Sequence, residues 1–374
     1  MEKLHILVTG GAGFIGSHLV DALVEKGHRV RILDSLVPQV HGDRIPEHLN
    51  KNAEFIRGDV CDPAAVAGAL DGIDVVYHEA AEVGVGQSMY EITRYVKAND
   101  MGTAVLLEEM IKRPGQFRKL MVASSMSIYG EGAYFCGDCD KKVFPFLRSN
   151  GQLSEHKWEF TCKECGGALR PIGTGEDKPL FPTSVYAVSK QDQEQYCLIV
   201  GRAYNIPTVA FRYFNVYGTR QALSNPYTGV CAIFSSRLLN DQRPLIYEDG
   251  GQTRDFVHVD DIVRANLLAL ETDKADYETI NIGTGRAVSV HEIALSLARG
   301  LGKNIEPEMV GKYREGDIRH CVADISKAKD LLNYHPSIKL EDGLAALLEW
   351  VKDQTAVDHV EAAKTELAAH KLVR

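Results

Sequence analysis

The N-terminal residues combine a short apolar run, a glycine-rich segment and a second apolar stretch in that order. Residues 4–8 predict a buried parallel strand, and the next segment, 9–16, carries glycines at positions 10, 13 and 16. A helix is predicted from Ser17 to Lys26. Glycines at such a strand-to-helix turn let backbone N–H groups approach a pyrophosphate at the helix N-terminus. We therefore predict a dinucleotide site here, in preference to a glycine-rich turn without a ligand.

Two further predicted strands end near acidic residues. Residues 30–33 form an apolar strand that ends at Asp34, and residues 54–57 form one that is followed by Asp59. Asp34 can accept hydrogen bonds from ribose hydroxyls and would repel a 2′-phosphate, which favours NAD over NADP. Asp59 can hydrogen-bond the adenine. The alternative for Asp34 is a local role in which it only caps the next turn.

Small residues follow the next predicted strand, residues 74–78. Ala80 and Ala81 would let a ligand lie close to the backbone at the carboxyl end of the sheet, where open α/β sheets bind ligands. A helix is predicted over residues 99–112. The alternation of strand and helix up to about residue 130 predicts an α/β fold with a Rossmann-type, doubly wound parallel sheet.

Four cysteines interrupt this alternation. Cys136 and Cys139 form one Cys-x-x-Cys pair, and Cys162 and Cys165 form a second pair after 22 intervening residues. Two such pairs, the second followed by glycine, predict a structural tetrahedral zinc site. Because four thiolates complete the tetrahedron, the metal would have no open position for chemistry and would act as a scaffold. A rubredoxin-like iron site, two disulfides or free thiols are the alternatives.

Tyr186 and Lys190 stand four residues apart on a predicted helix that runs to about Tyr204. This spacing places both side chains on one face, about 5–6 Å apart at Cβ. A nearby ammonium favours the phenolate form of a tyrosine. The pattern alone also describes an ordinary surface pair. The predicted strand at 119–123 brings Ser125, with Ser124 as its rival, to the carboxyl edge of the sheet.

Charge and hydropathy restrict the partners of the chain. The formal net charge of the 374 residues is −9, which argues against nucleic acid or an anionic membrane as the main partner. An anion site must then be built locally by a few basic side chains. No run approaches the roughly 18 apolar residues of a spanning helix, and the N-terminus lacks the features of a signal peptide. We expect a cytoplasmic protein, with its eight cysteines present as thiols or metal ligands.

Five motifs in this order resemble the extended short-chain dehydrogenase/reductases. Within them the chain is most similar to the nucleotide-sugar epimerase/dehydratase family, whose reference member is UDP-glucose 4-epimerase. The motifs are Thr9-Gly10-x-x-Gly13-x-x-Gly16, Ser125, Tyr186-x-x-x-Lys190, Arg212-Tyr213-Phe214-Asn215 and Arg254-Asp255-Phe256-Val257-His258. The resemblance covers residues 1 to about 350, except the cysteine insert.

This resemblance implies an NAD-dependent nucleotide-sugar 4-epimerase, which oxidises C4 to a 4-keto sugar and reduces it again on the opposite face. It implies catalytic roles for Tyr186 as acid or base, for Lys190 beside the nicotinamide ribose and for Ser125 on the substrate hydroxyl. Cofactor contacts are implied for Gly10, Gly13, Phe14, Ile15, Gly16, Asp34, Asp59, Val60, Ala80, Ala81, Asn99, Tyr186 and Lys190. Substrate contacts are implied for Ser125, Asn215, Arg254, Arg314, Asp317 and Cys321. For the two arginines, a surface ion pair is the alternative.

Departures from the family pattern narrow the activity. The 4,6-dehydratases of the family carry Asp-Glu directly after the catalytic hydroxyl residue, where this chain has Met126-Ser127, so dehydration is disfavoured. Cys321 is small at the position that limits sugar size, which implies room for a bulkier sugar. Glu79 replaces the usual leucine, and nothing in the sequence explains this substitution.

The cysteine insert is similar to inserts in bacterial members of the family that act on dTDP-L-rhamnose. We therefore expect dTDP-L-rhamnose or a UDP-hexose as the substrate. The alternatives are a 4-ketosugar reductase, a UDP-glucuronate decarboxylase and a non-catalytic NAD-sensing protein that keeps only the fold. Because the insert lies between the Ser125 strand and the Tyr186 helix, we expect it at the substrate mouth.

The expected organisation has four parts. Residues 1–130 and 177–222 form the NAD-binding domain, to which 252–283 return, and residues 131–176 form the zinc-binding insert with its four cysteines. Residues 223–251 and 284–352 form a smaller substrate-binding α/β domain. Residues 353–374 form a tail, helical on the surface. The family resemblance also implies a homodimer that pairs the helices at 99–112 and 189–204.

Overall fold

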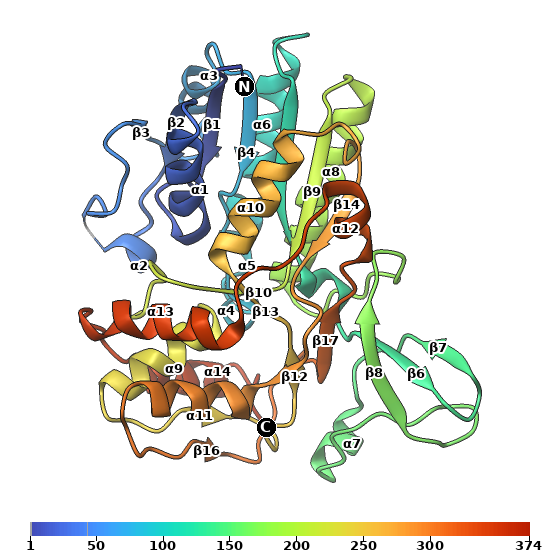
Figure 1. Ribbon diagram of the computed structural model, residues 1–374. Helices are drawn as coiled ribbons and strands as arrows, with labels where there is room; N and C mark the ends of the chain where they lie inside the picture. The colour runs from blue at the N-terminus through green and yellow to red at the C-terminus, as the bar shows by residue number, and fades with distance from the viewer. Residues whose placement is uncertain (1, 43) are drawn as a thin grey trace.

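Seven parallel strands form the main sheet of the computed structural model, which describes residues 2–42 and 44–374 (Figure 1). Their spatial order is β14-β9-β5-β4-β1-β2-β3. The strands are β1 (His5–Thr9), β2 (Arg29–Asp34), β3 (Glu54–Arg57), β4 (Val75–His78), β5 (Lys119–Ser125), β9 (Thr208–Tyr213) and β14 (Thr279–Ile282). The order reverses between β1 and β4, so the predicted doubly wound Rossmann-type sheet is confirmed. Such a reversal leaves a crevice at the carboxyl ends of the strands.

Helices pack against both faces of this sheet. One face carries α1 (Phe14–Glu25), α10 (Val259–Leu270) and α12 (Ser326–Leu332), and the other carries α3 (Pro63–Ala69), α6 (Gly102–Ile111) and α8 (Val185–Ala203). Neighbouring residues of a strand point to opposite faces. Ile6 therefore joins the core under α1, and Leu7 joins the core under α6. The sheet is buried on both sides, as a parallel sheet requires.

A second sheet lies below the first in Figure 1 and contains six strands in the order β15-β12-β17-β8-β6-β7. These strands are β6 (Ala133–Cys136), β7 (Lys141–Val143), β8 (Leu169–Thr174), β12 (Thr253–Arg254), β15 (Val288–Ser289) and β17 (His320–Ala323). Three helices enclose a separate core beside it: α9 (Val230–Leu239), α11 (Val290–Gly300) and α13 (Leu340–Lys352). Two short parallel pairs complete this half, β10 (Asn215–Tyr217) with β13 (Phe256–His258) and β11 (Leu245–Ile246) with β16 (Glu308–Met309).

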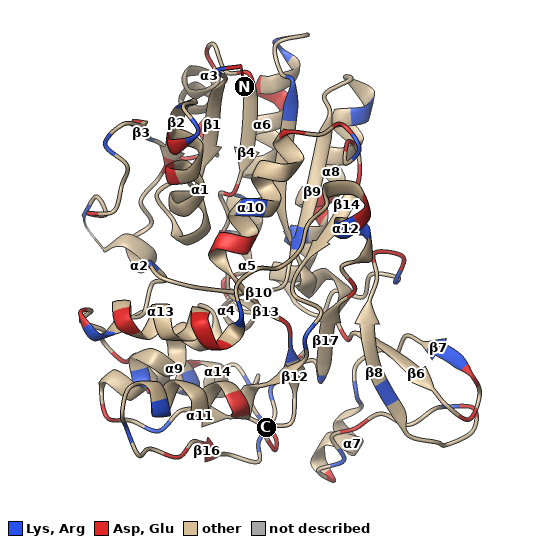
Figure 2. Cartoon of the chain, in the orientation of Figure 1, with Lys and Arg blue, Asp and Glu red and all other residues tan. Residues whose placement is uncertain are grey.

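The remaining helical segments are short, apart from the last. They are α2 (Pro38–His41), α4 (Val85–Ser88), α5 (Ile92–Tyr95), the π-helix η1 (Val96–Met101), the 3₁₀ turn η2 (Met126–Tyr129), α7 (Asn150–Ser154) and α14 (Val360–Ala369). Within the described residues, no helix is both long and apolar enough to cross a membrane. Acidic and basic residues are interspersed over most elements (Figure 2).

Two helix boundaries differ from the sequence prediction. Helix α1 begins at Phe14 rather than Ser17, because Gly13 takes the extended backbone of an N-cap directly before it. The helix predicted from Asn99 begins earlier, as η1, and this π-helix turn continues into α6. Both differences lengthen a helix that reaches the carboxyl edge of the sheet.

The cysteine insert is continuous with the second sheet. Strand β8 pairs with β6 inside the insert and with β17 outside it, where Val322 and Ala323 lie opposite Gly173 and Thr174. The insert therefore joins the second sheet through shared backbone hydrogen bonds. It lies at the outer end of that sheet, on the right of Figure 1.

Candidate active site

A cleft of about 940 Å³ runs along the carboxyl edge of the seven-stranded sheet. It extends from the turn after β1, past the ends of β4, β5 and β9, to β11 and the loop at residues 314–318. Ligand pockets typically enclose about 300–1,000 Å³. The cleft also lies where the strand order reverses, which is the usual binding position in open α/β sheets. We take it as the candidate active site.

The glycine-rich turn forms one end of the cleft. Gly10 has a φ of +70°, and a Cβ atom on it would lie 2.7 Å from the backbone nitrogen of Ala80. A Cβ atom on Gly16 would collide with the carbonyl oxygen of Gly10. Gly13 caps α1 without a side-chain hydrogen bond, so the first N–H groups of this helix are free of a side-chain cap. Gly10, Gly13, Phe14, Ile15 and Gly16 all line the cleft, and the turn is built to hold an anion.

Asp34 and Asp59 line the same end. The Asp34 carboxylate accepts hydrogen bonds from the N–H groups of Ala12 at 3.0 Å and Leu36 at 2.9 Å. Its local capping role, left open by the sequence, is thus present, and the carboxylate also borders the cleft. Asp59 accepts a hydrogen bond from the N–H of Cys61 at 2.9 Å, and Val60 lines the cleft beside it. These contacts fix both carboxylates in place.

Ala80 and Ala81 line the cleft after β4, but Asn99 lies behind it. The Asn99 side chain is fully buried; its Oδ1 accepts a hydrogen bond from the N–H of Glu82, and its Nδ2 donates one to the Ser189 hydroxyl at 2.8 Å. Asn99 is not among the residues lining the cleft. Its amide fixes the loop after β4 against α8, and its predicted contact with the cofactor stays a prediction.

The three predicted catalytic residues converge on the middle of the cleft. Ser125 lies at the end of β5, Tyr186 in the first turn of α8 and Lys190 one turn later, and all three line the cleft. Burial raises the pKa of Tyr186, and its hydrogen bond with Ser125 opposes this rise. Burial lowers the pKa of Lys190 to about 8, and its Nζ donates a hydrogen bond to Gln193 at 2.9 Å. The arrangement places a phenol, a hydroxyl and an amine around one position.

Ser124, the rival of Ser125, is used elsewhere. Its hydroxyl donates a hydrogen bond to Glu194 at 2.7 Å, and Glu194 forms a buried ion pair with Arg212 at 2.6 Å. Ser125 instead accepts a hydrogen bond from the Ser127 hydroxyl at 2.9 Å. Ser125 is therefore the serine whose hydroxyl belongs to the cleft.

Glu79 adds an acidic group that the sequence left unexplained. It lines the cleft directly after β4, and its carboxylate accepts a hydrogen bond from the Tyr213 hydroxyl at 3.0 Å. Asn266 in turn donates to the Tyr213 oxygen at 2.7 Å. Burial raises the pKa of Glu79 to about 7, while the Tyr213 hydrogen bond and the charge of Lys190 oppose this rise. The signal available in the sequence was an acidic residue directly after a buried strand.

Polar and basic residues line the other end of the cleft. Asn215, Arg254, Arg314 and Asp317 all border it. The Asn215 Oδ1 is buried and has no hydrogen-bond partner among the described residues, so it is available to a ligand. Arg314 pairs with Asp317 at 2.8 Å and lies 4.7 Å from the ring centre of Tyr247.

Arg254 is held by the backbone beside the cleft. Its guanidinium donates to the carbonyl oxygens of Thr253, Ile318 and Arg319 at 2.8–3.0 Å. Basic positions on β12 and beside the start of β17 can be followed in Figure 2. An acidic protein thereby presents cations where an anionic ligand would lie.

Cys321 is not part of the cleft wall. It is buried on β17 in a small core with Met126 and Phe214, which do line the cleft, and its thiol contacts the Thr174 hydroxyl. Its side chain packs into the core behind the cleft, and its predicted contact with the sugar stays a prediction.

The insert and the tail lie differently from what the sequence led us to expect. Within the described chain, no residue of 131–176 lines the cleft, although Arg148 of the insert contacts Glu248 and Asp317, which do line it. Four residues of α14 line it instead, together with Leu372. The tail was expected on the surface. The apolar residues at positions 360, 363 and 367 are the sequence signal that could have indicated a buried face on this helix.

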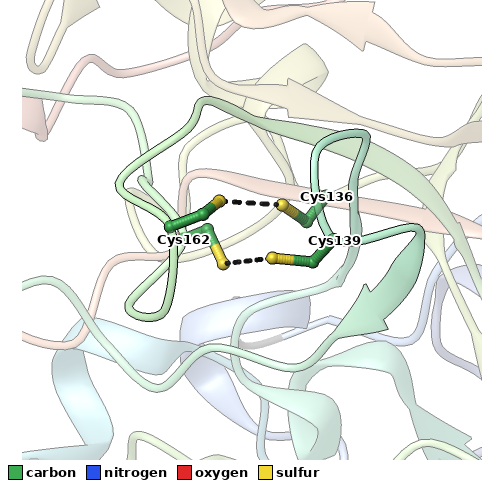
Figure 3. A group of neighbouring side chains, drawn as sticks. Cys136, Cys139 and Cys162 are labelled. Atoms are coloured by element: carbon green, nitrogen blue, oxygen red, sulfur yellow. Dashed lines mark hydrogen bonds between the residues drawn. The ribbon is translucent and has the colours of Figure 1, made fainter.

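The four insert cysteines form a compact cluster (Figure 3). Their sulfur atoms lie within 4.8 Å of one another, with 3.5 Å between Cys136 and Cys165 and 3.9 Å between Cys139 and Cys162. A disulfide requires about 2.05 Å between sulfurs, so these are four thiols. Tetrahedral zinc with bonds of about 2.3 Å separates its sulfurs by roughly 3.8 Å. The donor set and spacing fit a tetrahedral metal ion.

The fold and the cleft define a dinucleotide-dependent enzyme of the Rossmann type, with a serine, a tyrosine and a lysine in the middle of the cleft. The family model for the NAD dependent epimerase/dehydratase family matches residues 6–158 and 160–283. The chain belongs to this family, so the recognition made from its motifs is confirmed.

Relatives of the chain fall within the same chemistry. It is 35% identical to dTDP-L-rhamnose 4-epimerase of Burkholderia thailandensis, over 93% of this chain and 95% of that protein. It is 30% identical to UDP-N-acetyl-alpha-D-glucosaminuronate decarboxylase of Bacillus cytotoxicus, over 94% and 98%. Among solved structures it resembles UDP-glucuronic acid 4-epimerase from Bacillus cereus, in complex with UDP-glucuronic acid and NAD. That match has a TM-score of 0.77 and 32% identity, over 93% of this chain and 99% of the other.

Proposed function

We propose that this protein is an NAD-dependent nucleotide-sugar 4-epimerase. The observation that carries the proposal is the meeting of Ser125, Tyr186 and Lys190 in one cleft, between a glycine-rich anion cradle and an end lined by arginines. Epimerases among the relatives support it. The order of these parts along the cleft puts a sugar beside Tyr186 when its nucleotide occupies the arginine end.

NAD is the proposed cofactor. The turn from Gly10 to Gly16 would hold the pyrophosphate at the start of α1. Only glycine fits at positions 10 and 16, because a Cβ there would strike the backbone. Asp34 favours NAD over NADP because its carboxylate would repel a 2′-phosphate. Asp59, Val60, Ala80 and Ala81 would border the adenine and ribose, and Lys190 the nicotinamide ribose. When bound, NAD supplies reversible hydride transfer at C4 of the sugar.

The chain's own residues would move the proton and orient the sugar. Tyr186 would remove the proton of the C4 hydroxyl and later return it, with Ser125 sharing a hydrogen bond to the same oxygen. A Lys190 ammonium beside the phenol would favour the phenolate, whereas burial raises the pKa of Tyr186. Asn215, Arg254, Arg314 and Asp317 would hold the nucleotide diphosphate and its ribose while the 4-keto sugar turns over in the pocket.

We propose dTDP-L-rhamnose or a UDP-hexose as the substrate. Proton NMR of the purified protein with a panel of UDP, dTDP and GDP sugars should reveal a new 4-epimer from one of them. If no member of the panel is epimerised while UDP-glucuronate releases CO₂, a decarboxylase replaces the proposal.

Cofactor use separates the epimerase from a reductase and from a protein that only binds NAD. An epimerase can return the hydride to the same sugar, so dialysed enzyme with retained NAD should turn over without added cofactor. A 4-ketosugar reductase must be supplied with NAD(P)H in every cycle. A non-catalytic NAD-sensing protein would bind NAD and leave every sugar unchanged; the presence of both Tyr186 and Lys190 speaks against it.

The cysteine cluster is proposed to hold a structural zinc ion. Its support is the sulfur spacing, which matches a tetrahedral ion, and the four thiolates, which fill the four coordination positions that structural zinc prefers. A reducing compartment such as the cytoplasm belongs to the proposal, because it keeps thiols available to metal. Iron in the same tetrahedron is the alternative, and metal analysis distinguishes the two.

We also propose that separate segments bind the cofactor and the substrate, and that the protein is a homodimer. Residues 1–130, 177–222 and 252–283 would bind NAD, and residues 223–251 and 284–352 would bind the nucleotide sugar. The dimer is supported by exposed apolar side chains on η1 and α8: Val96, Met101, Val188, Tyr196 and Ile199. Light scattering should give twice the chain mass, and Ile199→Glu should shift it to the monomer.

A further inference from the structure

The C-terminal residues 357–374 cross the cleft that the proposed function assigns to NAD and a nucleotide sugar. Helix α14 presents Val360, Ala363, Lys364 and Leu367 to the cleft, and Leu372 follows them. The C-terminus ends close to β12 in Figure 1. A segment outside the two sheets thus supplies part of the wall of the site.

One side of the tail is attached to the residues that follow β4 and to Tyr227, which precedes α9. Glu366 accepts hydrogen bonds from the hydroxyls of Tyr90 at 3.0 Å and Tyr227 at 2.9 Å. The ring of His370 stacks on Tyr90 with 4.6 Å between ring centres. Leu367 packs against Gly86 of α4, where a Cβ atom would lie 3.2 Å from it. Helix α4 also contacts the start of α8, since Ser88 accepts a hydrogen bond from the N–H of Tyr186 at 3.0 Å.

The other side is attached to the second half of the molecule. Arg237 of α9 pairs with Asp358 and with Glu361, each at 3.2 Å. The backbone of Arg374 exchanges two hydrogen bonds of 3.0 Å with that of Tyr313, and its guanidinium pairs with Glu315 at 2.8 Å. The tail therefore connects both halves across the cleft and ends beside Arg314.

Lys364 is the basic residue of α14 that faces the cleft. Its partner is Glu361 at 3.3 Å on the same helix, and its side chain is 38% exposed. Burial raises the pKa of the Tyr247 phenol; the charges of Arg314 and Lys364 oppose this rise, and those of Asp317 and Glu361 add to it. Two cations therefore lie near the Tyr247 ring at the end of the cleft that also contains Arg254.

We propose that α14 is part of the substrate site, with Lys364 as a ligand of the nucleoside diphosphate and Leu367 as an apolar cover over the cleft. A diphosphate carries at least two negative charges, and Arg314 is already paired with Asp317, so a further basic side chain at this end would strengthen its binding. Lys364 would leave its exposed partner Glu361 to contact the phosphates. Because the tail closes over this end, it retains the nucleotide as well as contacting it. This inference rests on the proposed function, since that function places a nucleotide there.

The test measures binding of UDP and of dTDP to the purified full-length holoenzyme by titration calorimetry. Lys364→Met should raise the Kd of whichever nucleotide binds the wild type by about tenfold. Lys352→Met is the matched control, because Lys352 is an exposed lysine of α13 paired with Glu349 outside the cleft, and its Kd should stay within twofold. Glu366→Ala removes the acceptor for Tyr90 and Tyr227 and should speed nucleotide dissociation several-fold.

Each outcome decides a different claim. If Lys364→Met binds within twofold of wild type, the inference is overturned and the proposed epimerase stands. If the wild type binds neither UDP nor dTDP, the proposed function falls and the inference with it. Hydrogen exchange of the wild type gives a test that does not depend on whether the variants fold. Addition of the nucleotide should protect the amides of residues 360–369 from exchange. Unchanged exchange contradicts the inference.

Discussion

The Tyr213 hydroxyl donates a hydrogen bond to the Glu79 carboxylate across 3.0 Å, at the buried side of the cleft where Lys190 lies. The Glu79 carboxylate favours the charged form of Lys190: burial lowers the pKa of that amine, the carboxylate opposes the fall, and the resulting pKa is about 8. A buried charged residue of this kind can tune the pKa of a neighbouring catalytic group without touching the reacting atoms.

Replacing Glu79 by Gln should therefore change the pH profile. Without the carboxylate the pKa of Lys190 falls further, so its ammonium is lost at lower pH. The alkaline limb of kcat/KM should move down by about one pH unit, a shift typical of removing one nearby opposite charge. Profiles between pH 5 and 10 measure this. Glu54→Gln, on the exposed edge strand, should leave the limb in place, and Glu79→Asp should restore most of it.

Tyr186→Phe should lower kcat by at least about 10²-fold, since loss of a positioned acid or base removes typically 10²–10⁴ in rate. The retained NAD, measured by absorbance after denaturation, should equal that of wild type, because phenylalanine keeps the ring. Tyr204→Phe at the exposed end of α8 is the control. Turnover within a few-fold of wild type in Tyr186→Phe would remove the phenol from the proposed mechanism.

The sequence predicted the main sheet and most of the cleft because those features depend on local patterns. Strand alternation, glycine spacing and residues directly after strands indicated Gly10, Asp34 and Ser125 at one edge. The four-residue spacing to Lys190 and the family resemblance indicated Tyr186. Asn99 and Cys321 were placed by analogy of position, and the orientation of a buried side chain depends on packing partners distant in sequence. The structure turns Asn99 toward Glu82 and Ser189, and Cys321 toward Thr174.

The insert and the tail could not be located from the sequence for a related reason. Chain order placed the insert between the Ser125 strand and the Tyr186 helix, but β8 pairs with β17, a strand far along the chain, and this carries the insert away from the cleft. The tail returns to the cleft through single contacts such as Glu366 with Tyr90. Long-range pairings of this kind leave no periodic signal in either segment.

Metal analysis should find about one zinc per chain, as a closed four-cysteine site binds one ion. Cys136→Ser should abolish most of this zinc and lower the midpoint of thermal unfolding, because Cys136 belongs to the small buried core of the insert with Tyr134 and Phe160. Cys61→Ser, outside the insert, should change neither quantity. Metal-free wild-type protein with full activity and unaltered stability would contradict the zinc proposal.

Arg148 connects the insert to residues at the substrate end of the cleft, from behind the cleft wall. Its guanidinium forms a buried ion pair with Glu248 at 2.7 Å and donates to the carbonyl oxygen of Asp317 at 3.3 Å. Breaking a buried pair costs about 3–5 kcal/mol, and since Arg319 also pairs with Glu248 we expect about 2–3 kcal/mol for Arg148→Met.

Arg148→Met should also raise the KM for the nucleotide sugar several-fold with little change in kcat, because Asp317 and Arg314 lose a fixed support while Tyr186 is untouched. Urea unfolding and steady-state kinetics measure the two effects. Arg170→Met is the matched control inside the insert, since Arg170 is exposed on β8 and lies over the Phe135 ring. If both variants raise KM equally, the effect belongs to the insert as a whole; if neither does, Arg148 is a structural residue without influence on the substrate end.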